Sequence, residues 1–381
     1  MEKKEKSPKG KRIALGIVCT LLALVVIAMV GGTVLADTLL SGVNYVEKGQ
    51  DATLSPEEAL ALLASEKAEQ DATEDEEEPT EASTEAATEE TTEATEETTE
   101  EPTEEPTEDE ETLGTDNPDA VGDEDYITNV LLVGQDSRTG RRERSDTMIL
   151  VTINSEKDTI VLTSFMRDMY VMIPGYFKEK INAAYMLGGM DLLNATLYEN
   201  FGVVVDHNVE VSFKQFTKII DYLGGIDLEL TQKEADFVNK AMGKGAAQLV
   251  EGMNHLNGHR ALAYARYRKD ATGDFGRTER QRKTINAVIE KYKDSDLTTM
   301  IGMVNKLMGM ITTNMTKTEI LGYAVKYFPM LASAEIVSQR VPFDGKHTNN
   351  KDYYYMNKVD EISVVVPNLK ENREKLAETL S

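Results

Sequence analysis

The densest group of side chains suited to binding or catalysis is a basic stretch at residues 260–283, RALAYARYRKDATGDFGRTERQRK. Eight of its 24 residues are Lys or Arg, and three are Asp or Glu. Arginine side chains form forked hydrogen bonds that match phosphate oxygens better than lysine ammonium groups do. The stretch therefore indicates either a site for a phosphate-bearing ligand or a solvated helix face with internal ion pairs.

The spacing of these residues is compatible with a single anion site. Arg266 and Arg268 are two positions apart, so they share a side of an extended or turn backbone. Arg277, Arg280 and Gln281 have the i, i+3, i+4 spacing that forms one stripe on a helix. A glycine-containing turn separates the two groups. Such a turn allows both groups to converge on one ligand.

Two aspartates and a further arginine lie at the ends of predicted strands. Asp136 and Asp146 flank one loop, where two carboxylates can share a hard cation whose remaining contacts come from a phosphate. The alternative is a pair of ordinary turn or cap aspartates, which are common at strand ends. Arg167 directly follows the next strand, at the kind of loop where α/β sheets bind ligands.

Short apolar runs alternate with helical patterns between residue 126 and the C-terminus. The predicted strands are 129–134, 145–154, 158–164, 208–212, 225–230 and 335–341. The predicted helices are 190–200, 213–223, one ending near 327 and one from 368 onward. This alternation predicts a layered α/β domain.

The N-terminal region reads as a membrane anchor. Residues 1–12 carry six Lys or Arg, and residues 13–36 are 24 uncharged, mostly apolar residues. A helix of this length spans a hydrocarbon core of roughly 30 Å. The basic flank should remain in the cytoplasm, which places the rest of the chain outside. A cleaved signal peptide is the alternative, but its apolar region is usually about 7 to 15 residues. The only cysteine, Cys19, lies within this run, so the outer part of the chain has no disulfide.

The formal charge of −26 is concentrated in one segment. Residues 69–125 contain 27 Asp or Glu and no Lys or Arg, whereas residues 126–381 contain 32 acids and 33 bases. Residues 69–119 are rich in Glu and Thr with few apolar residues, so we expect them to be disordered. A capped helix is expected near 56–68. We interpret residues 37–125 as an extracellular spacer that holds the folded domain away from the membrane or lets it reach into the cell wall.

Six sequence blocks occur between residues 126 and 292: GQDSR, RSDTMILVTIN, SFMRDMYVMIPG, KINAAYMLGG, DYLGGIDLEL, and LNGHRALAYARYR with GDFGRTERQR. Read together and in this order, they resemble the LytR-CpsA-Psr family of cell-wall polymer ligases. The resemblance implies that residues 126–381 form a catalytic domain, a three-layer α/β/α sandwich with a central mixed sheet. One transmembrane helix and a disordered acidic linker are expected to precede it.

The resemblance also implies a role for individual residues. Asp136 and Asp146 match the acids that hold Mg²⁺ (or Mn²⁺) in the family. The matching pyrophosphate contacts are Arg167, Arg266, Arg268, Arg277 and Gln281. Asp146, Asp274 and Arg266 are the expected catalytic residues. Either aspartate of this group could deprotonate the acceptor hydroxyl, and the sequence leaves both open.

The implied activity is that of a membrane-anchored phosphotransferase. Its donor would be a polyprenyl-pyrophosphate-linked glycan and its acceptor a hydroxyl of peptidoglycan. This places it at the membrane of a Gram-positive-type cell, with a single pass and the N-terminus in the cytoplasm. The apolar runs 130–133, 149–151 and 160–162 either line a tunnel for the polyprenyl chain or form plain core.

A pyrophosphatase acting on the same lipid and a non-catalytic wall-polymer-binding module both remain open. Nucleic-acid binding is rejected because only 12 residues would lie in the cytoplasm.

Overall fold

The structure is a computed structural model that describes residues 44–47, 49, 51, 53–74, 120–135, 142–243, 245–292, 306–327, 334–346, 351–359 and 362–381. The described residues belong to two compact units. One contains helix α3 (Pro56–Glu74), and the other contains the described residues up to Leu54 and from residue 120 onward. The predicted anchor at 13–36 lies outside the described residues. Within the described ranges, none of the helices has the length and apolar character needed to cross a membrane.

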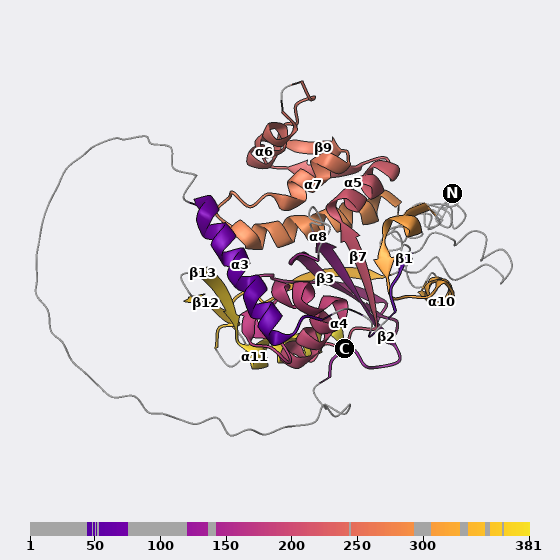
Figure 1. Cartoon of the computed structure of the whole chain (residues 1–381). Coiled ribbons are helices and arrows are strands. Elements are labelled where there is room, and N and C mark those ends of the chain that lie inside the picture. The colour runs from indigo at the N-terminus through magenta and orange to yellow at the C-terminus, as the bar shows by residue number, and fades with distance from the viewer. Residues whose placement is uncertain are drawn as a thin grey trace, which may run out of the picture. The chain divides into compact units, whose positions relative to one another are not determined.

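A seven-stranded mixed β-sheet forms the centre of the larger unit (Figure 1). In spatial order its strands are β1 (Asn44–Tyr45), β10 (Thr312–Thr313), β7 (His207–Ser212), β2 (Ile127–Gln135), β3 (Ser145–Asn154), β4 (Thr159–Phe165) and β11 (Glu335–Val341). Strands β2, β3 and β4 are antiparallel to their neighbours in this group, whereas β7 and β11 pair parallel with β2 and β4. The expected central mixed sheet is therefore confirmed.

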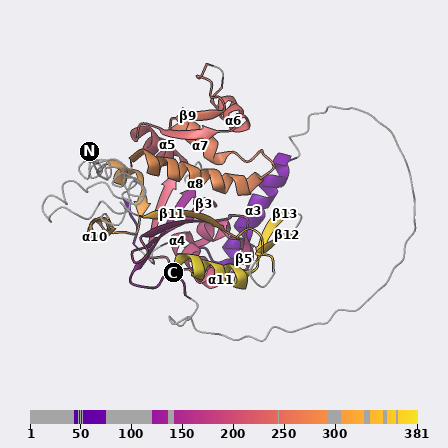
Figure 2. The same ribbon diagram turned by 180° about the vertical axis from the view of Figure 1, so that it is seen from behind.

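Helices lie on both faces of this sheet (Figures 1 and 2). On one face are α5 (Phe213–Tyr222), α7 (Gly258–Arg266) and α8 (Gly273–Tyr292). On the other are α4 (Asn182–Phe201) and α11 (Leu369–Leu380). Because both faces are covered, strands β3 and β4 are almost continuously buried, as their unbroken apolar runs require.

Smaller elements complete the unit. They are the ribbons β5 (Tyr170–Met172) with β6 (Lys178–Lys180), β8 (Ile226–Leu230) with β9 (Gly252–Leu256) and β12 (Tyr354–Val359) with β13 (Ile362–Pro367), the helices α6 (Gln232–Met242) and α10 (Lys317–Tyr327), and the 3₁₀ turn η2 (Met308–Met310). No strands were predicted in the region that the β12–β13 ribbon occupies.

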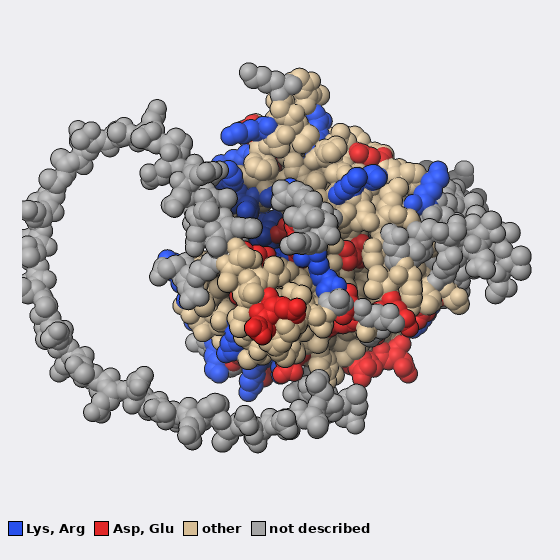
Figure 3. Space-filling model, in the orientation of Figure 1, with Lys and Arg blue, Asp and Glu red and all other residues tan. Residues whose placement is uncertain are grey.

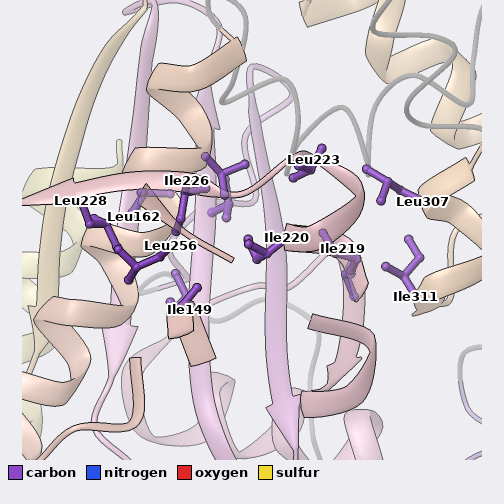
Figure 4. Packing of buried hydrophobic residues seen from close by; sticks show 14 of the residues in the cluster. Ile149, Leu162, Ile219, Ile220, Leu223, Ile226, Leu228, Leu256, Leu307 and Ile311 are labelled. Carbon is purple, nitrogen blue, oxygen red and sulfur yellow. The ribbon is translucent and has the colours of Figure 1, made fainter. Parts of the chain in front are cut away.

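The main apolar core lies between the sheet and α5, α7 and α8. Figure 4 shows strand residues such as Ile149 and Leu162 facing Ile220 of α5 and Leu256 of β9. Burial of each such side chain stabilises the fold by about 1.5–3 kcal/mol. A capping box fixes the start of α5: Gln215 N donates to Ser212 Oγ (3.3 Å), and Ser212 N donates to Gln215 Oε1 (2.7 Å). The helix thereby begins where its apolar face meets the sheet.

The segment before α3 changes the predicted domain organisation. Strand β1, at residues 44–45, pairs with β10 at the edge of the central sheet. The folded domain thus receives a strand from the region predicted to be spacer. Between the predicted anchor and β1 there are only seven residues, 37–43, which span at most about 25 Å. The acidic segment follows β1 and precedes β2, so it is an insertion between two strands of one sheet. Residues 44–45 therefore belong to the folded domain and not to a spacer, while the membrane anchor and the acidic linker remain predictions.

Helix α3 starts where the sequence predicted it. Ser55 Oγ and Glu58 Oε2 lie 2.8 Å apart, and Glu58 N donates back to Ser55 Oγ at 3.3 Å, which is a capping box. The helix continues to Glu74 and so includes the first residues of the segment expected to be disordered from 69 onward. Residues 75–119 lie outside the described part of the chain.

Candidate active site

A cavity of about 220 Å³ lies between the sheet and the helices on the core side. Its apolar wall is formed by strand and helix residues, most of which belong to the main core or pack against it. They include Leu132, Ile149, Val209, Val211, Phe213, Ile219, Ile220, Leu223, Leu262, Ile285, Val288 and Ile311. Figure 4 shows several of these side chains pointing toward one another. Of the three apolar runs proposed for a tunnel, 130–133 and 149–151 contribute to this wall, whereas Ile160 and Leu162 pack in the core.

The rest of the cavity wall is polar and strongly charged. It is formed by Asp146, Thr147, Arg167, Arg266, Arg268, Arg277, Gln281 and Thr284. Figure 3 shows Lys and Arg side chains gathered in a hollow on the face in view, with Asp and Glu side chains beside them. The structure thus brings all five residues proposed as pyrophosphate contacts to one cavity, together with Asp146.

Asp146 is positioned by an irregularity in the sheet. Gln135 and Gly134 of β2 pair with Ser145 and Thr147 of β3, so Asp146 is the extra residue of a β-bulge. A bulge increases the local twist and re-aims a side chain out of the regular alternation. Asp146 thereby faces Arg167, whose Nη1 donates to Asp146 Oδ1 at 2.6 Å.

A second carboxylate closes the charged network. Asp274 lies in the first turn of α8, and Arg277 Nη2 lies 2.9 Å from both of its oxygens. Arg167 Nε is 3.5 Å from Asp274 Oδ1, and Arg277 Nη1 is 3.7 Å from Asp146 Oδ1. Arg167 and Arg277 therefore each contact both Asp146 and Asp274. These residues come from three parts of the chain: β3, the loop after β4, and α8.

This network leaves donors without an acceptor. Arg167 Nε and Arg277 Nε are buried and make no hydrogen bond. Unsatisfied buried donors cost roughly 1–3 kcal/mol each. Guanidinium groups with spare N–H donors can donate hydrogen bonds to the oxygens of an additional anion. The arrangement is suited to bind phosphate beside the two aspartates.

Arg266 and Arg268 reach the cavity from the end of α7. Arg266 ends the helix, and Tyr267 has an extended backbone with φ −64° and ψ 130°. The Tyr267 ring packs away from the cavity against Phe237, with centroids 4.6 Å apart. The two arginines consequently share the opposite side, as their spacing predicted. The Arg266 guanidinium also lies over the Phe213 ring at 4.6 Å, which orients it by a cation–π contact.

Arg280 does not join the anion site, although its spacing placed it on the same predicted stripe. Its Nε donates to Glu234 Oε1 at 2.7 Å, its Nη1 donates to the Tyr267 carbonyl at 3.0 Å, and its Nη2 pairs with Asp270. Arg280 therefore braces the loop that carries Arg268. Its position on α8, three residues after Arg277, turns it toward α6 and this loop.

Burial shifts the proton affinities of the network. Burial raises the pKa of Asp274, although Arg277 and Arg167 act in the opposite direction. Burial also lowers the pKa of Arg277. For Arg167, burial acts to lower the pKa, but Asp274, Asp168 and Asp146 outweigh it, so the pKa is raised. A carboxylate with a raised pKa is a better general base at neutral pH than an ordinary aspartate.

Of the two aspartates proposed to hold Mg²⁺, the structure describes only Asp146. Asp136 lies outside the described residues, and the described residues contain no group of three or more His, Cys, Asp or Glu arranged to hold a metal ion. Asp146 offers a carboxylate whose Oδ1 is held by Arg167. The carboxylate oxygens of Asp146 suit Mg²⁺, which is usually bound by one or two carboxylates together with substrate phosphates.

Asp168 and Lys180 extend the network, although no sequence pattern predicted a role for either residue. Lys180 Nζ lies 2.8 Å from Asp168 Oδ1, and Asp168 Oδ2 lies 3.7 Å from Arg167 Nε. Tyr170 pairs with Lys180 in the β5–β6 ribbon, which brings residue 180 beside residue 168. No spacing rule connects residues twelve positions apart without knowledge of this ribbon.

Comparison with known proteins gives a family for this arrangement. The LytR_cpsA_psr family model matches residues 82–371. A relative from Bacillus cereus, named polyisoprenyl-teichoic acid–peptidoglycan teichoic acid transferase TagU, is 33% identical over 234 residues, which cover 60% of this chain and 72% of the relative.

Solved structures are similar as well. Bacillus subtilis TagV superposes with a TM-score of 0.55 at 29% identity, covering 68% of this chain and 96% of TagV. The family protein YwtF (TagT) with bound octaprenyl pyrophosphate lipid superposes with a TM-score of 0.51 at 26% identity, covering 71% of this chain and 94% of YwtF.

Proposed function

The chain belongs to the LytR-CpsA-Psr family, and on that premise we propose that it transfers a glycopolymer, such as teichoic acid, from a polyprenyl-pyrophosphate carrier to a hydroxyl of peptidoglycan. A similar relative is named a teichoic acid transferase, and a similar structure contains octaprenyl pyrophosphate. The product would be a phosphodiester link between the polymer and the cell wall.

One observation carries this proposal: a cluster of arginines borders an apolar cavity. A pyrophosphate lipid has the same two-part chemistry. Its phosphates would contact Arg167, Arg266, Arg268, Arg277 and Gln281. A cavity of about 220 Å³ is slightly below the usual range of about 300–1,000 Å³ for small-molecule pockets. We therefore assign it to the isoprene units nearest the pyrophosphate.

The transfer step follows from this placement. The acceptor oxygen attacks the phosphorus that bears the sugar, the bond from that phosphorus to the bridging oxygen breaks, and polyprenyl phosphate leaves with the electron pair. Arg167 and Arg277 supply N–H donors at the position where negative charge develops. Preorganised donors of this kind are the largest single contribution in many enzymes.

The acceptor hydroxyl must lose a proton during the attack, and we assign this proton to Asp274. Its pKa is raised by burial, whereas Asp146 is held at 2.6 Å by Arg167. Asp146 would then act with Asp136 to hold Mg²⁺. The cation, when bound, would neutralise phosphate oxygens and stabilise the leaving group.

The domain organisation belongs to the same proposal. Residues 13–36 would anchor the chain in the membrane with residues 1–12 in the cytoplasm, and the domain would lie outside the cell as a three-layer α/β/α sandwich. Because β1 begins only seven residues after the anchor, the cavity would stay close to the membrane that contains the lipid carrier.

The test uses the full chain in detergent with a polyprenyl-pyrophosphoryl oligosaccharide, peptidoglycan fragments and Mg²⁺, with products identified by mass spectrometry. We expect oligosaccharide phosphate joined to the glycan, and loss of this product in Arg266→Ala. Free oligosaccharide phosphate as the sole product would instead identify a pyrophosphatase. Lipid binding without turnover would identify a binding module.

A further inference from the structure

A second cavity, of about 360 Å³, lies on the opposite face of the same sheet. Side chains alternate across a strand, and β2 and β7 show this directly. Leu132 and Val209 line the first cavity, whereas Gln135 and Asn208 line the second. The second cavity therefore shares strands with the proposed transfer site but has its own wall, bounded also by α4 and the segment around β1.

The wall of this cavity is acidic. It contains Glu47, Asp51, Asp191 and Glu210, against one guanidinium, that of Arg142. Arg142 is held by Asp51, whose Oδ1 lies 2.9 Å from Arg142 Nη2. A wall with this charge repels phosphate, so its ligand belongs to a different chemical class from that of the first cavity.

Two of the acids, Asp51 and Asp191, accept hydrogen bonds from backbone amides. Helix α4 is interrupted at Gly188 and Gly189, which leaves amides without an intrahelical acceptor at the start of its second half. Asp51 Oδ2 accepts from Met190 N at 2.8 Å, so it acts as an N-cap supplied from a distant segment. Asp191 Oδ2 accepts in return from Gly49 N at 2.9 Å. These bonds hold Gly49 and Asp51 beside α4, where Asp51 forms part of the cavity wall.

Several hydrogen-bond donors around the cavity already have acceptors. Gln135 Nε2 donates to Glu210 Oε1, and the buried hydroxyl of Tyr185 is hydrogen-bonded to Glu210. Thr313 Oγ1 donates to the Asn208 carbonyl at 2.7 Å. Burial and the neighbouring Glu210 carboxylate raise the pKa of Tyr185, which keeps its hydroxyl protonated as a donor.

Two buried acceptors have no hydrogen bond. Gln135 Oε1 and Asn208 Oδ1 are unpartnered, and these side chains are only 8% and 3% exposed. Both residues line the cavity. An unsatisfied buried acceptor is destabilising, and here two of them occur in the wall of one acidic cavity. A ligand that completes this wall must donate hydrogen bonds, and positive charge would favour it further.

We propose that the second cavity binds a primary ammonium group, as carried by an amino sugar or by the side-chain amine of a peptide. An ammonium has three donors and no acceptor. This matches a wall in which two acceptors have no hydrogen bond and several donors already have acceptors. A neutral sugar hydroxyl would also need donors from the wall. Divalent cations are disfavoured, since the described residues include no cluster of three potential metal ligands. This site is separate from the proposed transfer site.

The test is isothermal titration of the full chain in detergent with glucosamine and with L-lysine amide, at slightly acidic pH and constant salt. Glucose and inorganic phosphate are the matched ligands that lack the amine. We expect heat of binding from at least one amine and none from glucose or phosphate. Binding of glucosamine alone would identify an amino sugar, and binding of lysine amide alone a peptide amine. No binding of either amine, or equal binding of glucose, would overturn the proposal.

Two variants locate the site. Glu210→Gln removes the charge at nearly constant shape, and Gln135→Met removes the amide acceptor. Each should weaken amine binding by about tenfold or more, because hydrogen bonds to charged groups are worth about 1.5–3 kcal/mol. Glu229→Gln, which removes an exposed acid of β8, should bind as the wild type does. Circular dichroism establishes that each variant is folded. Unchanged binding in both folded cavity variants would also overturn the proposal.

Discussion

Replacement of Arg277 by lysine separates charge from geometry at the proposed site. Arg277 is 4% exposed, and its Nη2 lies 2.9 Å from both oxygens of Asp274. Lysine keeps the positive charge but has no fork, so it cannot contact Asp274 and a phosphate oxygen in the same geometry. Loss of one preorganised donor typically lowers the rate by about 10²–10³-fold. We therefore expect kcat/KM for transfer to fall by about 10²-fold in Arg277→Lys.

Stability should respond much less than activity to this change. Removal of one partner of a buried ion pair costs about 3–5 kcal/mol, but lysine retains the pairing charge. The raised pKa of Asp274 further limits the cost, since a carboxylate that loses its partner can take up a proton. We expect a loss of about 1–2 kcal/mol, which is a few degrees in Tm.

The assay measures initial transfer rates and thermal unfolding of the full chain in detergent. Lys283→Ala is the control, because Lys283 is on the same helix, is 53% exposed and pairs with Glu279 at the surface. It should change neither quantity appreciably. A wild-type transfer rate in Arg277→Lys would refute the role assigned to the fork. Equal loss of rate in Lys283→Ala would show that the loss is not specific to Arg277.

Three further outcomes follow from the structure. Because a base must be deprotonated and burial raises the pKa of Asp274, the transfer rate should fall as pH decreases through that raised pKa. Asp274→Asn should lose most of the rate and this acidic limb, and an unchanged pH–rate profile would exclude the assignment. Ala265→Phe places a large side chain at a buried position of the cavity wall. It should raise KM for long-chain donors more than for a short-chain analogue. Equal effects on both donors would show that the lipid does not occupy this cavity. Chelation with EDTA should abolish transfer and added Mg²⁺ should restore it, and full activity in EDTA would exclude a metal requirement.

The central part of the fold was predictable from sequence because its signals are local and strong. The apolar runs of β2, β3 and β4 are buried on both faces and end at polar loops, so their positions agree with the predicted strands to within two residues. The last helix starts directly after Asn368, as predicted. Strand β1 was missed because two residues carry no periodicity, and its pairing with β10 joins segments far apart in the sequence.

The candidate site was predictable in its residue types but not in its geometry. The one-residue gap between Arg266 and Arg268 correctly indicated a shared side, since Tyr267 turns into the interior. The i, i+3, i+4 spacing wrongly placed Arg280 at the anion site. Glu234 and Asp270 lie within reach of its guanidinium and form ion pairs with it instead. The second cavity had no sequence signal, because Gln135 and Asn208 become neighbours only through strand pairing.

The most direct test of the central claim follows the fate of the leaving lipid and the oxygen of the attacking nucleophile. The full chain is incubated with donor, peptidoglycan fragments and Mg²⁺ in ¹⁸O-labelled water, and the products are quantified by mass spectrometry. Transfer predicts one polyprenyl phosphate released for each oligosaccharide phosphate joined to the glycan, with no ¹⁸O in that phosphate. Free oligosaccharide phosphate that contains ¹⁸O, without linked glycan, would show that water is the acceptor and would contradict the account.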